Sequence, residues 1–381
     1  MHAQAGRLRY CVAIVTRRSE TMRALILALA AFCASASLVA NAALAATEPG
    51  AVEANIAFVK ADAEKAVTEL ATALQESFVF PDKGTAYAEM LRAKLAAGEY
   101  ASFPSANAFA TTVTADLRAV HKDGHLRLRP LSAGQRAARQ KAGHRGGPAS
   151  KSAIGKTGWL AAGVAYIETR GFPGNDTTIA DVRKFLAAHR DANTLIIDAR
   201  GNGGGGLDEM NLIFSEIFAK PTTLVVMDIR QAVEETRGTP FGDDPTLRKA
   251  SGPATIIRRE HFVTPAPNQG RLRDAKVYLL TSKNTFSAAE HLSLSLKRTK
   301  RATLVGEATG GGAHFGGGVP LGNGYEAFIP VGRTFDPDTG QSWEGVGVRP
   351  DVAVAADKAL DEALKLAGVS VSADLALASL K

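Results

Sequence analysis

The chain of 381 residues has only two cysteines, Cys11 and Cys33, and both lie within its first 45 residues. If those residues are a cleaved leader, the mature protein has no thiol, which excludes disulfides, thiol catalysis and cysteine-ligated metals together. Long hydrophobic runs are scarce as well. The clearest one, from Ala24 to Ala40, is rich in small side chains and short for a membrane span. Such a protein must be held together by its core alone.

Excess charge is also small. The formal net charge is +7, and the first 45 residues carry +4 of it because they hold five Arg and one Glu. The remaining +3 is too little to predict nucleic-acid binding. With 45% hydrophobic and 22% charged residues, the composition is that of an ordinary globular protein, long enough for one large domain and a small one.

Residues 1–45 are predicted to be a signal peptide. Arg17, Arg18 and Arg23 precede the apolar run, and small-residue triplets at 40–42 and 43–45 follow it. Since Met22 with the apolar run is a compact signal by itself, residues 1–21 are interpreted as an alternative, mis-assigned start. We therefore expect a periplasmic or secreted protein with no stable membrane insertion after cleavage; an uncleaved N-terminal anchor is the alternative.

Residues 46–130 are predicted to form a helical domain. Pro81 ends a first helix, and Ser105 is a candidate N-cap for the third. Residues 131–158 contain basic residues and no acid, which predicts a solvated basic linker, with an anionic surface partner as the alternative. The first helix shows apolar residues spaced three and four apart, namely Ile56, Val59, Ala63, Val67, Leu70 and Leu74.

Residues 159–368 alternate strand and helix patterns, which predicts an α/β fold with a mostly parallel sheet. The run Thr194–Asp198 is continuously apolar, as expected for a strand buried on both faces. Residues 231–275 are polar and proline-rich, and are predicted to be an insertion. Residues 369–381 are predicted to be a C-terminal tail.

Ser287 is the first candidate for chemistry. It lies where a predicted buried strand gives way to a helix, and a helix N-terminus favours negative charge such as that of an oxyanion. Ser287 and Glu290 also fit a capping box. The stretch by itself leaves both interpretations open.

Three further segments are candidates. The glycine-rich run at 201–206 follows another buried strand and could bring backbone N–H groups close to an anion, although such runs are more often plain turns. His121 and His125 are spaced like a metal pair, but no third ligand is evident, which disfavours zinc. Glu344 follows a tryptophan and precedes a glycine-rich segment that could hold an imidazole in place.

Together and in this order, these segments resemble the tail-specific (C-terminal processing) serine protease family. The resemblance is to its branch without a PDZ domain, which includes the interphotoreceptor retinoid-binding protein repeats and the tricorn protease core. It covers most of residues 53–368 and implies a crotonase/ClpP-like ββα catalytic domain preceded by a small helical domain. The matching motifs are Asp123-Gly124-His125-Leu126 and residues 198–205, 281–290, 305–314 and 343–351.

The resemblance implies a Ser-His-Glu triad, with Ser287 as nucleophile, His125 as base and Glu344 orienting the imidazole. The implied oxyanion hole uses the backbone N–H groups of Ala288 and of Gly203 or Gly204. The PDZ-bearing branch uses a lysine instead, and Gly312 stands at that position here, so only the triad version is open to this chain. About thirty residues separate the regions that would flank a PDZ domain, too few to hold one.

The sequence thus predicts an exported serine peptidase that hydrolyses peptide bonds, with peptide or protein substrates and neither a metal nor an organic cofactor. Whether it reads substrate C-termini stays open. The alternative is a non-catalytic protein that binds an apolar ligand in the interdomain cleft. An acyl-CoA enzyme on the crotonase fold is disfavoured, since CoA chemistry is cytoplasmic.

Overall fold

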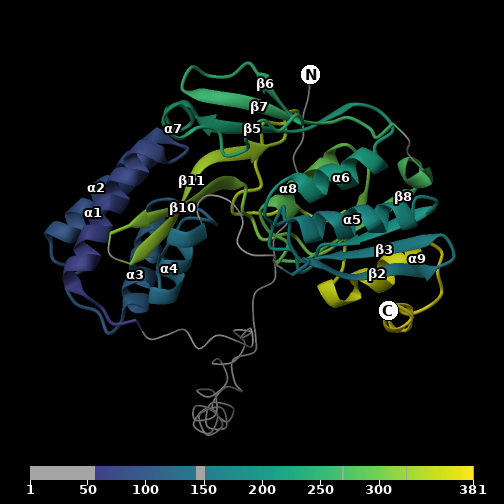
Figure 1. Cartoon of the computed structure of the whole chain (residues 1–381), viewed down its shortest axis with the longest axis horizontal. Helices are drawn as coiled ribbons and strands as arrows, with labels where there is room; N and C mark the ends of the chain where they lie inside the picture. The colour runs from purple at the N-terminus through teal and green to yellow at the C-terminus, as the bar shows by residue number, and fades with distance from the viewer. Residues whose placement is uncertain (1–55, 143–150, 268–269, 323, 381) are drawn as a thin grey trace, which may run out of the picture. The chain divides into compact units, whose positions relative to one another are not determined.

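The computed structural model describes residues 56–142, 151–267, 270–322 and 324–380 (Figure 1). The predicted signal peptide and its cleavage triplets lie outside the described residues. None of the helices in these ranges combines the length and the hydropathy that crossing a bilayer demands.

The first three elements along the described chain are helices, and their positions are close to the predicted ones. Pro81 stands in the first turn of the second helix, where a missing N–H costs nothing, and so separates it from the first. The Ser105 side chain accepts a hydrogen bond from the N–H of Ala108 at 3.1 Å, which confirms the predicted N-cap of the third. The helices are α1 (Lys60–Ser77), α2 (Pro81–Ala96) and α3 (Ala106–Val120).

The segment predicted as a linker contains regular structure. Strand β1 (Arg127–Pro130) leads into helix α4 (Ala133–Ala142), and strand β2 (Ile154–Ala161) begins before residue 158. Residues 133–137 are exposed, as expected of a solvated segment, but the segment also holds a helix and the start of a strand. Alanine, glutamine and arginine are good helix formers, and their local propensity explains α4.

The predicted parallel sheet is present. Its strand order is β12-β9-β8-β4-β3-β2, and each neighbouring pair is parallel except β2 with β3. These strands, besides β2, are β3 (Val164–Thr169), β4 (Thr194–Asp198), β8 (Lys276–Thr281), β9 (Thr303–Gly306) and β12 (Val352–Ala353).

Both faces of the parallel sheet are covered, as predicted for Thr194–Asp198. Leu195 and Ile197 belong to the hydrophobic core on one side, and Ile196 belongs to the core on the other. The segment predicted as a C-terminal tail joins this second core, because Ala373 and Ala376 are buried. The first face is covered by α5 (Asp176–Ala188), α6 (Asp208–Ile217) and α8 (Ala288–Arg298), the second by α9 (Ala359–Leu366) and α10 (Ala373–Ala378) (Figure 1).

A second, antiparallel sheet was not predicted. Its order is β1-β11-β5-β7-β6, with β10 also paired to β11. Residues 231–275, predicted as an insertion, supply two of these strands and a helix. The elements are β5 (Thr222–Arg230), α7 (Gln231–Arg237), β6 (Leu247–Ala250), β7 (Ile256–Val263), β10 (His314–Leu321) and β11 (Tyr325–Phe335), while two 3-10 turns, η1 (Arg271–Arg273) and η2 (Ala356–Lys358), complete the chain.

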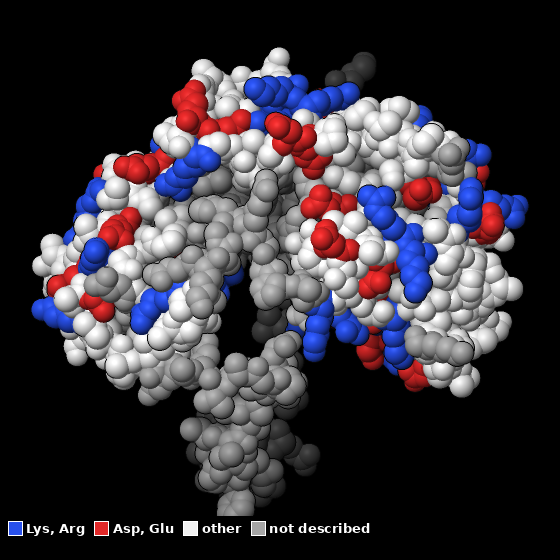
Figure 2. Space-filling view, in the orientation of Figure 1, with Lys and Arg blue, Asp and Glu red and all other residues white. Residues whose placement is uncertain are grey.

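The three N-terminal helices share a core with the antiparallel sheet. Leu70 of α1 and Phe109 of α3 are buried in one cluster with Ala327 and Ile329 of β11. Leu126 joins this cluster, which fixes the chain directly after His125. On the face shown in Figure 2, acidic and basic side chains are interspersed over the described part of the molecule.

Candidate active site

Two loops that follow neighbouring strands form the centre of the site. β4 pairs in parallel with β8, so the loops after them leave the same edge of the sheet. Thr285 Oγ1 donates a hydrogen bond to the carbonyl of Ala199 at 2.7 Å, and the N–H of Phe286 donates to the carbonyl of Asn202 at 3.0 Å. The glycine-rich turn is thereby fixed against the turn that begins α8.

Ser287 has an unusual backbone for a helix cap. Its φ is 56° and its ψ is −118°, a region that non-glycine residues rarely adopt. Ser105, an ordinary cap, is extended with φ −160° and ψ 163°. A strained strand-to-helix turn is the feature on which hydrolases expose a nucleophilic serine. The backbone at Ser287 thus has a form that capping alone does not require.

Glu290 does more than close a capping box. It is buried and accepts four hydrogen bonds, from the N–H groups of Ser287 (2.8 Å), Gly311 (2.6 Å) and Gly312 (2.7 Å) and from the hydroxyl of Thr309 (2.6 Å). Burial raises the pKa of its carboxyl, and these donors oppose the rise. Glu290 therefore joins the serine turn to the loop at 309–312, a role that the sequence did not reveal.

Gly204 lies against the serine. A Cβ added at Gly204 would lie 2.8 Å from the Cβ of Ser287 and 2.9 Å from the backbone nitrogen of Ala288. Its φ of 96° also favours glycine. Only glycine lets the turn approach the serine this closely.

The predicted oxyanion donors differ in their present partners. The N–H of Gly203 donates to the carbonyl of Arg170 at 3.4 Å, and the N–H of Gly204 donates to Asn202 Oδ1 at 2.8 Å. For the N–H of Ala288, no acceptor is found within the described residues. Of the three N–H groups, only that of Ala288 has no acceptor among the described residues.

His125 is buried between two aromatic rings. Its ring centroid lies 4.6 Å from that of Phe286 and 5.1 Å from that of Phe328. Its Nδ1 is buried without a hydrogen-bond partner among the described residues. Burial lowers the pKa of His125 to about 4. The imidazole is therefore neutral at pH 7.

Glu344 contacts backbone groups on both sides of the site. Oε1 accepts from the N–H of Gly124 at 2.6 Å, while Oε2 accepts from the N–H groups of Ala313 (2.6 Å) and His314 (3.1 Å). The bond to Gly124 positions the residue before His125 rather than the His125 ring. The predicted contact between Glu344 and the imidazole stays a prediction.

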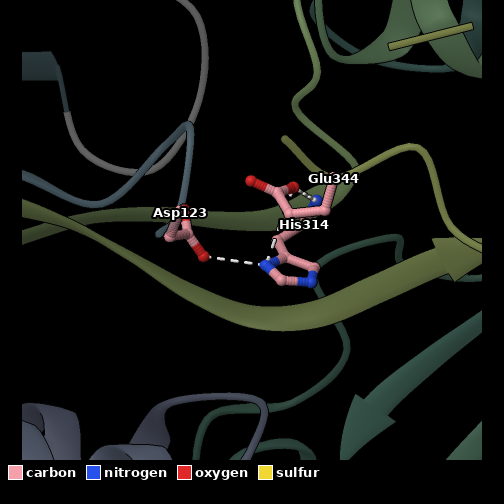
Figure 3. A group of neighbouring side chains, drawn as sticks. All are labelled: Asp123, His314 and Glu344. Atoms are coloured by element: carbon pink, nitrogen blue, oxygen red, sulfur yellow. Dashed lines mark hydrogen bonds and ion pairs between the residues drawn. The ribbon is translucent and has the colours of Figure 1, made fainter. Parts of the chain in front are cut away.

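A second histidine, His314, is bound by Asp123 (Figure 3). His314 Nδ1 and Asp123 Oδ2 are 2.7 Å apart, while Asp123 Oδ1 accepts from the N–H groups of His125 (2.8 Å) and Leu126 (2.9 Å). Burial by itself raises the pKa of Asp123, but the bond to His314 holds that pKa below its usual value. Both residues lie in motifs named above, yet nothing in their spacing indicated that they pair.

A cavity of about 310 Å³ lies beside the serine. Ser287, Ala288 and His291 of the α8 turn line one part of it, and Gly312 and His314 another. His125 does not line it. A Cβ added at Gly312 would lie 2.7 Å from Cε1 of His125, so the ring lies directly behind this glycine.

Asp123, His314 and Glu344 could hold a metal ion by residue type, since their ligand atoms lie within 4.8 Å of one another. The carboxylate oxygens of this group already accept the hydrogen bonds described above. Asp123 Oδ1 and Glu344 Oε2 accept two hydrogen bonds each, and the other oxygen of each carboxylate accepts one. The group acts as a hydrogen-bonded junction, and the expectation of no metal stays a prediction.

This serine turn belongs to a chain that matches a known family. The family model of peptidase family S41 covers residues 163–354, just over half of the chain. The chain belongs to peptidase family S41. A second model, the N-terminal domain of Peptidase_S41 in eukaryotic IRBP, matches residues 50–154. The resemblance inferred from the motifs is thereby confirmed, and an S41 peptidase acts on peptides or proteins.

Solved structures with a TM-score above 0.5 share the fold of this S41 chain. A putative peptidase from Parabacteroides merdae is 18% identical with a TM-score of 0.53, and the match covers 81% of this chain and 96% of that one. A lipoprotein from Streptococcus agalactiae is 15% identical with a TM-score of 0.51, covering 82% and 98%. The photosystem II D1 C-terminal processing protease is 15% identical with a TM-score of 0.49, covering 78% and 94%.

Proposed function

We propose that this S41 peptidase is an exported serine hydrolase that cleaves peptide bonds with Ser287 as nucleophile. His125 is its base, Glu344 supports that base, and Ala288 with Gly203 or Gly204 forms the oxyanion hole. Export rests on the leader sequence alone. An N-terminus near Ala43 or Ala46 in the native protein would support it.

The backbone of Ser287 carries the proposal. A φ of 56° is costly for serine, and the N–H to Glu290 bond together with the Gly204 contact holds it in place. The same turn places the serine at the cavity and leaves the Ala288 N–H without an acceptor among the described residues. A nucleophile and a donor for its oxyanion thus lie side by side.

The assignment of His125 rests on its protonation and its position. A neutral imidazole can take the serine proton, and burial keeps this one neutral. The ring lies behind Gly312, which lines the cavity with Ser287. A rotation that brings the ring past Gly312 would also give its unpartnered Nδ1 a way out of the apolar pocket.

The alternative, a non-catalytic binder of an apolar ligand, needs neither the strained serine nor a free backbone donor beside it. The cavity is also of mixed character, since Asp208, Asp244 and His291 line it beside Phe241 and Trp343. A retinoid-like ligand would displace water from those polar groups without offering them hydrogen bonds in return.

A fluorophosphonate probe, which reacts with an activated serine, tests the proposal. Wild type should be labelled and should cleave members of a broad peptide library. Ser287→Ala should lose both properties and stay folded, whereas Ser105→Ala, which removes an ordinary cap, should cost about 1 kcal/mol of stability and keep activity. EDTA should leave the wild-type rate unchanged. Wild type that takes no probe and cleaves no peptide would refute the proposal and favour the binding protein.

A further inference from the structure

A series of hydrogen-bonded polar side chains leads from the protein interior to the cavity. His261 Nε2 lies 2.7 Å from Asn211 Oδ1, and His261 Nδ1 lies 2.8 Å from His291 Nε2. His261 and His291 are 0% and 3% exposed. His291 is one helical turn after Ser287 and lines the cavity with it. The mechanism proposed above uses none of these three side chains.

The orientation of the Asn211 amide is fixed at the inner end. Thr246 Oγ1 donates its proton to Asp244 Oδ1 at 2.6 Å, so its lone pair is left to accept from Asn211 Nδ2 at 3.2 Å. Asn211 Nδ2 also lies 3.5 Å from Asp244 Oδ2, which can only accept. The NH₂ group therefore points at Thr246 and Asp244, and the amide oxygen points at His261.

The orientation of the Asn211 amide then determines which nitrogen of each histidine carries the proton. Because Asn211 Oδ1 is an acceptor, His261 Nε2 carries a proton. A neutral His261 then accepts at Nδ1, so His291 must donate from Nε2. Burial lowers the pKa of His261 to about 3 and the pKa of His291 well below its ordinary value, so both rings are neutral. In a neutral ring with a proton on Nε2, Nδ1 of His291 holds a lone pair.

The wall of the cavity thus offers acceptors. No partner of His291 Nδ1 is found among the described residues. Two carboxylates, Asp208 and Asp244, line the same cavity, and no lysine or arginine does so within the part of the chain that the structure describes.

We propose that His291 is a specificity-determining residue, and that the cavity selects substrates whose side chain on the acyl side of the scissile bond donates a hydrogen bond. This rests on the proposed peptidase function. Glutamine or lysine at that position pairs with Nδ1. Methionine, of similar length, displaces water from Nδ1 and leaves the acceptor unpaired, and glutamate meets like charge and a lone pair.

Four otherwise identical peptides, with Gln, Lys, Met or Glu at that position, test the inference. Wild type should show kcat/KM for Gln and Lys roughly 10- to 100-fold above Met, with Glu lowest. His291→Leu should remove the preference for Gln over Met. The matched control is His189→Leu, which removes another buried histidine, one that packs on Phe185 and does not line the cavity. It should keep the wild-type ratio.

Nitrogen-15 chemical shifts of the His291 ring provide a readout without substrate. Nε2 should be protonated and Nδ1 unprotonated, and Asn211→Leu, which frees His261 to exchange tautomers, should disturb that pattern. A protonated Nδ1 in wild type, or equal rates for Gln and Met in an enzyme that the probe labels, would overturn the inference and leave the peptidase proposal standing. A protein that takes no probe and cleaves none of the four peptides would overturn both.

Discussion

Asp123 holds both His125 and His314, but by different parts of each residue. Its Oδ1 accepts the backbone N–H of His125 at 2.8 Å, whereas its Oδ2 binds the ring of His314 at 2.7 Å. The His125 ring lies between Phe286 and Phe328, and its Nδ1 has no hydrogen-bond partner in the described part of the chain. The His314 ring lines the cavity that contains the serine.

The difference separates a ring whose Nδ1 has no hydrogen-bond partner among the described residues from a ring that is fixed by one. A buried nitrogen without a partner costs about 1–3 kcal/mol, and a rotation that pairs it regains that energy. The His314 ring is oriented by an acceptor, so Nδ1 carries its proton and Nε2 is the atom left for the cavity. This contrast supports the proposal that His125 transfers the proton and that His314 forms a fixed part of the cavity wall.

The largest expected effect comes from removing the His125 ring. His125→Ala should lower kcat on the order of 10⁴-fold or more, as loss of a triad base does. His314→Ala should lower kcat/KM about tenfold through a reshaped cavity, with kcat less affected. Steady-state kinetics with one peptide, together with the rate of probe labelling, would measure both. The reverse order would identify His314 as the base and Asp123 as its carboxylate partner.

A smaller effect is expected from Glu344→Gln. Glutamine has one acceptor oxygen where glutamate has two, so either the bond from Gly124 or the bonds from Ala313 and His314 are lost. Loosening the backbone before His125 should lower kcat about 10- to 100-fold, less than removing the ring.

The matched control is Glu168→Gln, which weakens a pair with the exposed Arg170. Its rate should stay within about twofold of wild type. Equal losses in Glu344→Gln and His125→Ala would mean that Glu344 acts on the imidazole itself, as the family resemblance implies.

The parallel sheet and the helices on it could be predicted because their signals are local. β4 is continuously apolar, and each of its faces meets a core. The antiparallel sheet could not be predicted, because β7 is polar in sequence and gains its partners from distant residues. Arg258 of β7 binds Asp228 of β5 at 2.7 Å, and Arg259 pairs with Glu234 of α7. Such a strand looks like a loop until its partners are known.

The candidate site likewise has a part that the sequence could predict and a part that it could not. Ser287, His125 and Glu344 could be named from motifs, and the structure brings their segments together around Gly312. Asp123 and His314 are separated by 191 residues, and no spacing along the chain predicts a bond between them. The position of the His125 ring depends likewise on Phe286 and Phe328, which lie on separate elements.

The last expected effect is on folding stability rather than on rate, and it tests where the His125 ring lies. Burial lowers its pKa to about 4, against about 6.5 in an unfolded chain. Between these pH values the unfolded chain binds the proton and the folded protein does not. The stability that neutral His125 contributes is therefore present above pH about 6.5 and is lost as pH falls toward 4. The loss for this group is roughly 3 kcal/mol.

His125→Phe keeps an aromatic ring between Phe286 and Phe328 and removes the titrating group. Urea unfolding of wild type and variant across this interval gives two free energies of unfolding at each pH. Subtracting one free energy from the other cancels the contributions of the other titrating groups, including His261. As pH falls, wild type should lose stability relative to the variant. The slope of that loss approaches about 1.4 kcal/mol per pH unit. A difference that stays constant would place the His125 ring in contact with water, and both histidines would then face the cavity in the free protein.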